Sequence, residues 1–214
     1  MIQAIHNELP HSEHRGCYFH HTQSIIRWIQ KHSLIQLYKD DRNVRTVVHQ
    51  LMALGFLPIH RVKDAYNELL TAAPSELIGL FNYYKSYWID NIGVELFNVN
   101  NREHRTNNAV ESWHSRFKKI VIQKSPNIFE LIHFLIQEQV GTEQTIGNLE
   151  LGLKVADKKS QTTRLDSNIQ RVKEQFNNGI LSETAFLTAI GFFLHSDISV
   201  PNLSYEFYFN LYKV

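Results

Sequence analysis

Two residues at one junction between a polar stretch and a helix have the types and spacing for metal chemistry. Glu111 and His114 stand three positions apart, so in a helix they share one face. The residues before them, from Arg105 to Asn108, are polar and rich in Asn. A carboxylate beside such a loop offers the oxygen ligands that Mg²⁺ or Mn²⁺ prefers. The pattern also has a structural interpretation, which is the more common one: Asn108 caps the helix and Glu111 completes a capping box.

The single Cys of the chain forms a second candidate site. Cys17 and His20 make a Cys-x-x-His pair, which supplies two ligands. A closed zinc site needs four, and a His from elsewhere, such as His114, would have to help complete it. We therefore expect no zinc at Cys17 and His20. The alternative is a buried Cys beside a His that bonds to the backbone.

Basic side chains around the same junction are candidates for contacts with DNA phosphates. They are Arg102, Arg105, Arg116, Lys118 and Lys119. The whole chain carries a formal net charge of only +1, without the basic excess of a free-standing nucleic-acid-binding domain. A solvated helix face is the default interpretation. A second basic stretch, between Lys154 and Lys173, is interrupted by acidic residues and carries little weight.

Several function classes lack their motifs in this sequence. It contains no Gly-rich phosphate loop, no Gly-x-Ser-x-Gly and no His-Glu-x-x-His. One Cys excludes an intramolecular disulfide and fits a reducing compartment. No apolar run approaches the roughly 18 residues of a membrane span, and the N-terminal residues do not form a secretory leader. We expect a nuclear or cytoplasmic protein that is not secreted and has no membrane partner.

The elements that position these residues are predicted to be mainly helical, with few short strands. Gly and Pro are scarce, at 9 and 5 of 214 residues. Apolar residues spaced by three and four predict helices over 22–38, 43–57, 62–71, 74–89, 109–122, 126–136, 168–177 and 183–195. Pro58 ends the second of these, Ser125 and Pro126 open the sixth, and Ser182 caps the last. Residues 94–99 are predicted to be extended, and the alternating residues 204–214 to be a short strand or an extended arm.

Four segments, taken in order and spacing, resemble the Mutator-like (MULE) family of cut-and-paste DNA transposases. They are Gly16-Cys17-Tyr18-Phe19-His20 with Gln23, Leu51-Met52-Ala53-Leu54-Gly55-Phe56-Leu57-Pro58, Glu95-Leu96-Phe97-Asn98-Val99, and Arg105-Thr106-Asn107-Asn108-Ala109-Val110-Glu111-Ser112-Trp113-His114. Each segment alone is weakly specific, and their shared order over roughly residues 1–140 is what makes the resemblance specific. The tail resembles the C-terminal helices of the family more loosely.

The resemblance implies roles for individual residues. The catalytic domain of the family has an RNase H-like fold with an Asp-Asp-Glu triad that works with Mg²⁺ or Mn²⁺. Glu111 matches the catalytic Glu, with His114 as a possible support, and Asn107 and Asn108 match the residues before it. The Cys-x-x-His pair at Cys17 matches the family motif. DNA is the implied partner.

The resemblance also implies a domain order. It assigns residues 1–21 and 93–140 to remnants of the RNase H-like core, 22–92 to the helical insertion, and 141–214 to a helical tail. The two catalytic Asp residues of the family lie upstream of the position of Ala4, and all Asp residues of this chain come after the Cys-x-x-His pair. One Glu cannot hold the two cations of phosphodiester cleavage.

We therefore expect a truncated transposase fragment that is inactive by itself. Without its sheet partner, the helix that bears Glu111 is expected to expose an apolar face around Val110, Trp113 and Phe117. The alternative is a domesticated helical module that binds DNA or protein, as a homo-oligomer or with a transposase chain. A third hypothesis, a nuclease subunit whose Asp residues come from another chain, requires precise docking of a missing sheet.

Overall fold

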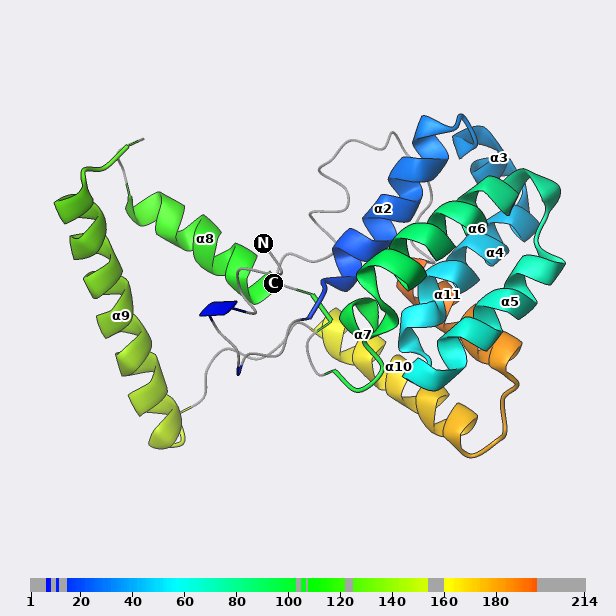
Figure 1. The fold of residues 1–214 in the computed structure, drawn as a ribbon. Helices are drawn as coiled ribbons and strands as arrows, with labels where there is room; N and C mark the ends of the chain where they lie inside the picture. The colour runs from blue at the N-terminus through cyan, green and yellow to red at the C-terminus, as the bar shows by residue number, and fades with distance from the viewer. Residues whose placement is uncertain are drawn as a thin grey trace. The chain divides into compact units, whose positions relative to one another are not determined.

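The computed structural model describes residues 7–8, 11, 15–102, 105–106, 108–121, 125–153 and 160–195 (Figure 1). These ranges contain helices and no strand, so the predicted mainly helical fold is confirmed for them. They form two compact units. One unit holds the helices from α2 to α7, most of α10, and α11, and the other holds α8 and α9. No described helix is long and apolar enough to cross a membrane.

Short helices joined by tight connections build the larger unit. Its α-helices are α2 (Tyr18–Lys31), α3 (Ile35–Asp40), α4 (Arg42–Ala53), α5 (Val62–Ala72), α6 (Ile78–Tyr84), α7 (Val94–Phe97), α10 (Ser160–Asn177) and α11 (Glu183–His195). Three 3₁₀ turns, Leu54–Phe56, Ile59–Arg61 and Ser75–Leu77, and a π-helical segment, Lys85–Ile92, connect them. The smaller unit consists mainly of α8 (Asn108–Ile120) and α9 (Ile128–Glu150).

Side-chain caps define where several helices begin. The Asp41 carboxylate accepts the backbone N–H groups of Asn43 and Val44 at 2.7 and 3.1 Å, which satisfies two of the open donors at the start of α4. The Ser182 hydroxyl oxygen accepts the N–H of Ala185 at 3.2 Å, as expected for the cap of α11. The connection after α4 leaves the helical conformation at Leu57, before Pro58, because a proline restricts the residue that precedes it.

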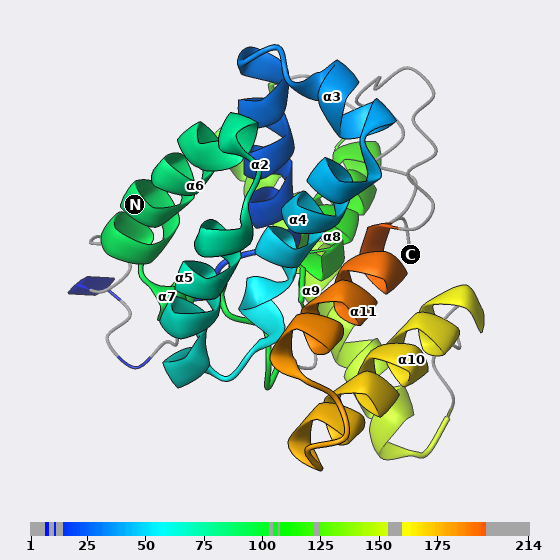
Figure 2. The same cartoon turned by 90° about the vertical axis from the view of Figure 1, so that its right-hand side faces the viewer.

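Helix α4 is the centre of the larger unit. Most of its side chains are buried, from Val44 to Ala53. Helix α11 lies along it, and Phe186, Leu187 and Ile190 of α11 are buried in the core (Figure 2). The two helices approach closely because α11 has a glycine at the crossing. A Cβ on Gly191 would lie 2.9 Å from the Cβ of His49.

The segment predicted to be extended, residues 94–99, is partly helical, and that prediction was wrong. Residues Val94–Phe97 form α7, and only Asn98 and the residue after it leave the helical conformation. Val94 and Phe97 lie three apart and are both buried, which fits one helical turn as well as a strand. Gly93, at φ 92°, starts the turn in a conformation that glycine adopts readily. The other predicted strand, residues 204–214, lies outside the described residues.

Several predicted helices have different limits in the structure. The helix predicted over 168–177 begins at Ser160, eight residues earlier than predicted. The helix predicted over 22–38 is interrupted: α2 ends at Lys31, and a turn with Ser33 at φ 59° separates it from α3. The helix expected to open at Ser125 and Pro126 begins at Ile128 and continues past Gly141 to Glu150. A glycine inside a helix is tolerated at a cost of about 1 kcal/mol, so Gly141 alone did not end it.

A capping box defines the start of α9. The Asn127 side chain accepts the N–H groups of Phe129 and Glu130 at 3.0 Å. The Glu130 carboxylate in turn accepts the Asn127 N–H at 2.9 Å. The start of α8 carries the same Asn-x-x-Glu spacing, and the capping box predicted there at Asn108 and Glu111 stays a prediction.

The close approach of α11 to α4 generates a first prediction. Replacing Gly191 with Ala should destabilise the protein by about 1–3 kcal/mol, because the new methyl group meets both the side chain and the backbone of His49. Urea unfolding followed by circular dichroism measures the change. Gly147→Ala in α9 is the matched control, since nothing lies within 4 Å of its Cβ position. Its expected effect lies between zero and about 1 kcal/mol of stabilisation. An unchanged midpoint for Gly191→Ala would contradict the close helix contact.

Candidate functional site

Three of the four segments that carry the transposase resemblance meet in the core of the larger unit, and the fourth contacts the first through Arg105 at its start. The first contact joins Gly16 to the segment that contains α7. The Gly16 N–H donates to the Leu96 carbonyl at 2.7 Å, and the Tyr18 N–H donates to the Arg105 carbonyl at 2.9 Å. A Cβ on Gly16 would lie 2.7 Å from the Leu96 carbonyl oxygen. Glycine is therefore required for this backbone contact.

The second contact joins the Leu51–Pro58 segment to the residues that follow α7. The Val99 N–H donates to the Gly55 carbonyl at 2.7 Å. The Asn98 side-chain amide donates to the Leu57 carbonyl at 2.7 Å and is almost fully buried. A Cβ on Gly55 would lie 3.2 Å from the Phe97 carbonyl oxygen. The glycines and the Asn of these segments thus serve backbone packing and hydrogen bonding.

The Cys-x-x-His pair lies at the start of α2. Cys17 occupies the N-cap position and is half-buried, whereas His20 is exposed. Within the described ranges, no group of three or more His, Cys, Asp or Glu side chains is arranged to hold a metal ion. The structure therefore adds no third ligand to this pair from the part of the chain that it describes.

The neighbouring His21 was missed by the sequence analysis and is the buried imidazole of this segment. Its ring stacks on Phe97 at a centroid distance of 5.0 Å and meets Trp88 edge-on at 4.8 Å. Its Nε2 lies 3.1 Å from the Tyr84 hydroxyl. Burial lowers the pKa of His21 to about 3 and raises that of Tyr84. The available signal was helical spacing, because His21 precedes Ile25 and Ile29 by four and eight positions.

A second pair of histidines lies where α4 packs on α11. The rings of His49 and His195 are 4.9 Å apart, and His49 Nε2 lies 2.7 Å from the Tyr38 hydroxyl. Burial and then the nearby Arg45 charge lower the pKa of His49 to about 4. Burial, followed by His49 and His21, lowers the pKa of His195 well below its ordinary value. His195 is buried and His49 is half-buried, and the lowered pKa values keep both rings neutral.

The basic residues predicted to contact DNA divide into two groups. Arg102 donates to the backbone carbonyls of Glu95, Leu96 and Gly16 at 2.7 to 3.4 Å. It therefore stabilises the contact between Gly16 and the segment that contains α7. Arg105 pairs with Asp166 at 2.7 Å. Arg116 pairs with a glutamate of α9. Lys118 and Lys119, in the last turn of α8, are exposed. The three arginines thus have partners inside the protein.

The predicted catalytic residue lies on the first turn of α8. Glu111 is half-buried and His114, one turn further along, is exposed. Asn107, predicted to flank the Glu, lies outside the described residues, as do Lys154, Lys158 and Lys159 of the second basic stretch. Neither residue of the predicted pair belongs to a metal-binding group in the described ranges.

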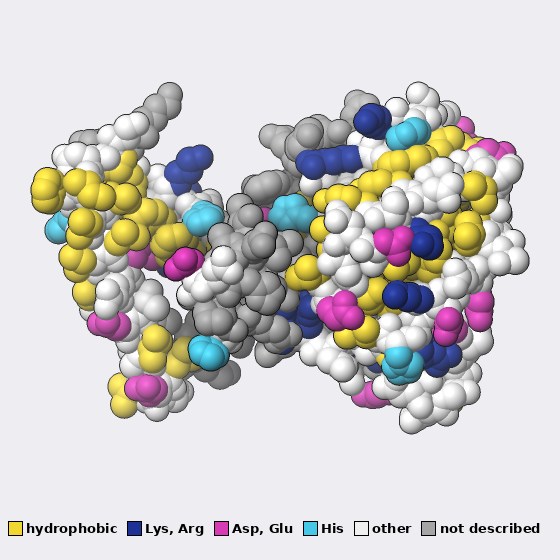
Figure 3. All heavy atoms as spheres, in the orientation of Figure 1, with side chains coloured by type: hydrophobic (Ala, Val, Ile, Leu, Met, Phe, Trp, Pro, Cys, Tyr) yellow, Lys and Arg dark blue, Asp and Glu magenta, His cyan; other side chains and the backbone are white. Residues whose placement is uncertain are grey.

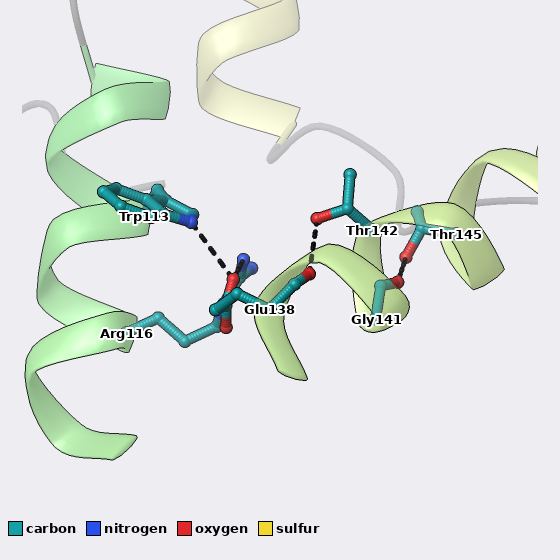
Figure 4. A network of polar contacts seen from close by, with 6 residues as sticks. All are labelled: Trp113, Arg116, Glu138, Gly141, Thr142 and Thr145. Carbon is teal, nitrogen blue, oxygen red and sulfur yellow. Dashed lines mark hydrogen bonds and ion pairs between the residues drawn. The ribbon is translucent and has the colours of Figure 1, made fainter. Parts of the chain in front are cut away.

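A polar network joins α8 to α9 (Figure 4). The Trp113 indole N–H donates to the Glu138 carboxylate at 3.0 Å, and Arg116 pairs with the same carboxylate at 2.7 Å. The hydrogen bond from Arg116 holds the pKa of Glu138 below its ordinary value. Trp113 also stacks on Phe117 of its own helix, at a centroid distance of 5.1 Å. These contacts turn Trp113 toward α9.

The α8–α9 unit has an exposed apolar surface. None of the described side chains of these two helices is buried. Val110 is 53% exposed, as expected, whereas Trp113 and Phe117 are half-buried and most of the exposed apolar surface lies on α9. The exposed apolar side chains of α9 are Ile128, Phe129, Ile132, Leu135, Ile136, Val140, Ile146 and Leu149 (Figure 3).

Comparisons with known proteins give no family assignment. No protein-family model, no curated protein and no solved structure matches this chain. The candidate sites must therefore be interpreted from the arrangement of the residues themselves.

The buried histidines generate a prediction about pH. Their folded-state pKa values lie below the unfolded value of about 6.5, so the unfolded chain binds more protons as pH falls. Stability should be fully present above about pH 7 and fall as pH drops from 6.5 toward 4, by up to about 1.4 kcal/mol per pH unit for each imidazole. Urea midpoints measured between pH 7.5 and 4.5 test this.

The control for this prediction uses the pH slope and not the absolute stability. Because glutamine cannot be protonated in this range, the double variant His49→Gln, His195→Gln should have a shallower slope than the natural sequence. His60→Gln, which removes an exposed imidazole, is the matched comparison. An equal slope in the natural chain and the double variant would show that His49 and His195 do not cause the acid sensitivity.

Proposed function

We propose that this chain is a transposase-derived helical module that does not cleave DNA by itself and that acts by binding another protein through the α8–α9 hairpin. The observation that carries the proposal is the contrast between the two units. The larger unit buries a continuous core, whereas the described residues of α8 and α9 bury none. Two helices with a wide apolar face and no core need another surface to cover that face.

The chemistry of the exposed face supports a protein partner over a nucleic acid. Across its 23 residues, α9 carries four glutamates and no Lys or Arg. Such a surface repels phosphates. Its large aliphatic and aromatic side chains are the kind that become buried at protein interfaces. The transposase ancestry rests on the order of the four segments.

A hydrophobic dye tests whether the face is available for docking. Bis-ANS should bind the dilute chain, and Ile132→Asp with Ile136→Asp should remove most of the fluorescence, because the charges disrupt the apolar surface on α9. Ile180→Asp is the matched control, since Ile180 is 69% exposed but belongs to the larger unit. Equal dye binding by the natural chain and the α9 variant would overturn the proposal.

DNA binding remains the second candidate, because Lys118 and Lys119 are exposed together. Two phosphate contacts predict a shallow dependence of log K on log salt, with a slope of about −2. A slope far steeper than this in a fluorescence-anisotropy titration would favour a DNA-binding module over a docking module. The double variant Lys118→Ala, Lys119→Ala should abolish this dependence of DNA binding on salt.

The absence of cleavage is tested in the same samples with Mg²⁺. The natural chain should nick plasmid DNA no faster than the variant Glu111→Gln.

A further inference from the structure

The exposed side of α9 carries a regular seam. Along the helix, residues separated alternately by four and three positions are Ile128, Ile132, Leu135, Gln139, Thr142, Ile146 and Leu149. This is the spacing that brings one stripe of a helix against a second helix in a coiled coil. Every member of the seam is exposed. Glu138, which contacts α8, lies three positions after Leu135 and four before Thr142, so it borders the seam on one flank.

From Ile132 to Leu149, the order of residue types is symmetric about a point between Gln139 and Thr142. These two polar residues occupy the centre and two apolar positions flank them on each side, while Ile128 is a third apolar position on the N-terminal side. When two such helices lie antiparallel, Gln139 faces Thr142 of the second copy, Leu135 faces Ile146, and Ile132 faces Leu149. Each apolar residue then meets an apolar residue, and the polar ones meet each other.

We propose that the seam of α9 binds α9 of a second copy of this chain, antiparallel, about a two-fold axis between Gln139 and Thr142. This inference rests on the proposed docking function and names its partner. Within α9 the Gln139 amide donates one N–H to Glu143 and the Thr142 hydroxyl donates to the Glu138 carbonyl, both at 2.9 Å. The second N–H of Gln139 donates to the Thr142 hydroxyl oxygen across the axis, twice by symmetry. Polar layers of this kind set register and orientation in paired helices at some cost in stability.

The exposed area suits a dimer of this kind. The eight large apolar side chains that α9 exposes are between 42% and 81% exposed. Since about half of a large side chain amounts to on the order of 100 Å², they offer roughly 800 Å². A standard interface buries about 800 Å² on each partner. The face is therefore large enough for a stable two-fold contact with a copy of itself.

The charges select the antiparallel orientation. Glu143 and Glu150 flank the C-terminal half of the seam, whereas Phe129 and Ile136 hold the corresponding positions in the N-terminal half. A parallel pair would place the glutamates of both copies at the same level, where like charges repel. An antiparallel pair places each glutamate beside the apolar half of the other helix. It also opposes the two helix dipoles.

The first experiment measures the mass of the full chain by sedimentation velocity over a range of concentrations. We expect a reversible monomer–dimer equilibrium. Leu135→Asp should weaken it by at least about 100-fold in Kd, because each dimer contains the buried charge twice. Ile180→Asp, on the larger unit, should leave the Kd unchanged. A monomer at every concentration overturns the inference, as does an equal effect of the two variants.

The orientation is measured in the natural seam, so it does not depend on a variant that disturbs the hairpin. A nitroxide on Asn148→Cys, in a Cys17→Ser background, reports the distance between copies. The antiparallel pair offsets the two labels along the axis by about 20 Å, since residue 148 lies beside residue 133 of the other helix. A parallel pair places them at the same level. Labels at the same level overturn the proposal.

Dye binding separates failure of this inference from failure of the proposed function. In the dimer, bis-ANS fluorescence per chain should fall as the protein concentration rises. A monomer that still binds dye at the α9 face leaves the docking function standing and excludes a second copy as the partner. A monomer that binds no dye there contradicts both.

Discussion

The fold of the larger unit depends on one constraint, the close backbone approach of two glycines to the segment around α7. Gly16 and Gly55 bring their chains within hydrogen-bonding distance of Leu96 and Val99, where a Cβ would meet carbonyl oxygens. These contacts hold the start of α2 and the end of α4 against the same short turn. The aromatic core around His21 then fills the space between them. Replacing either glycine with a larger residue would break this arrangement. A smaller residue elsewhere in the core would not restore it, because the clash is with the backbone.

Polar groups in this unit mostly satisfy one another. Arg102 donates hydrogen bonds to backbone carbonyls, the Asn98 side-chain amide donates to the Leu57 carbonyl, and Arg105 pairs with Asp166. The buried histidines remain neutral because burial disfavours their charged forms. Arg102 and Arg105, whose side-chain type suggested contacts with DNA, are thus used to stabilise the fold. This use agrees with the low net charge of the chain.

The smaller unit follows the opposite principle. Its two helices are joined by the polar contacts of Trp113 and Arg116 with Glu138. Its apolar side chains point outward along α9. Hydrophobic burial supplies most of the stability of helices in proteins, so this unit gains most of its stability only when its face is covered. Docking and folding of the hairpin are therefore expected to be coupled.

Apolar periodicity alone determined the helical class and the placement of most helices, because an amphipathic helix repeats every 3.6 residues wherever it packs. Sequence spacing also predicted Cys17, His20 and Glu111 as candidate site residues. Tertiary structure decided what periodicity cannot express: that residues 94–97 form a helical turn, that His21 and not His20 is buried, and that Arg102 serves backbone carbonyls. Those outcomes depend on which distant segments meet. A local pattern carries no information about contacts between positions 16, 55 and 96, because only the folded chain brings them together.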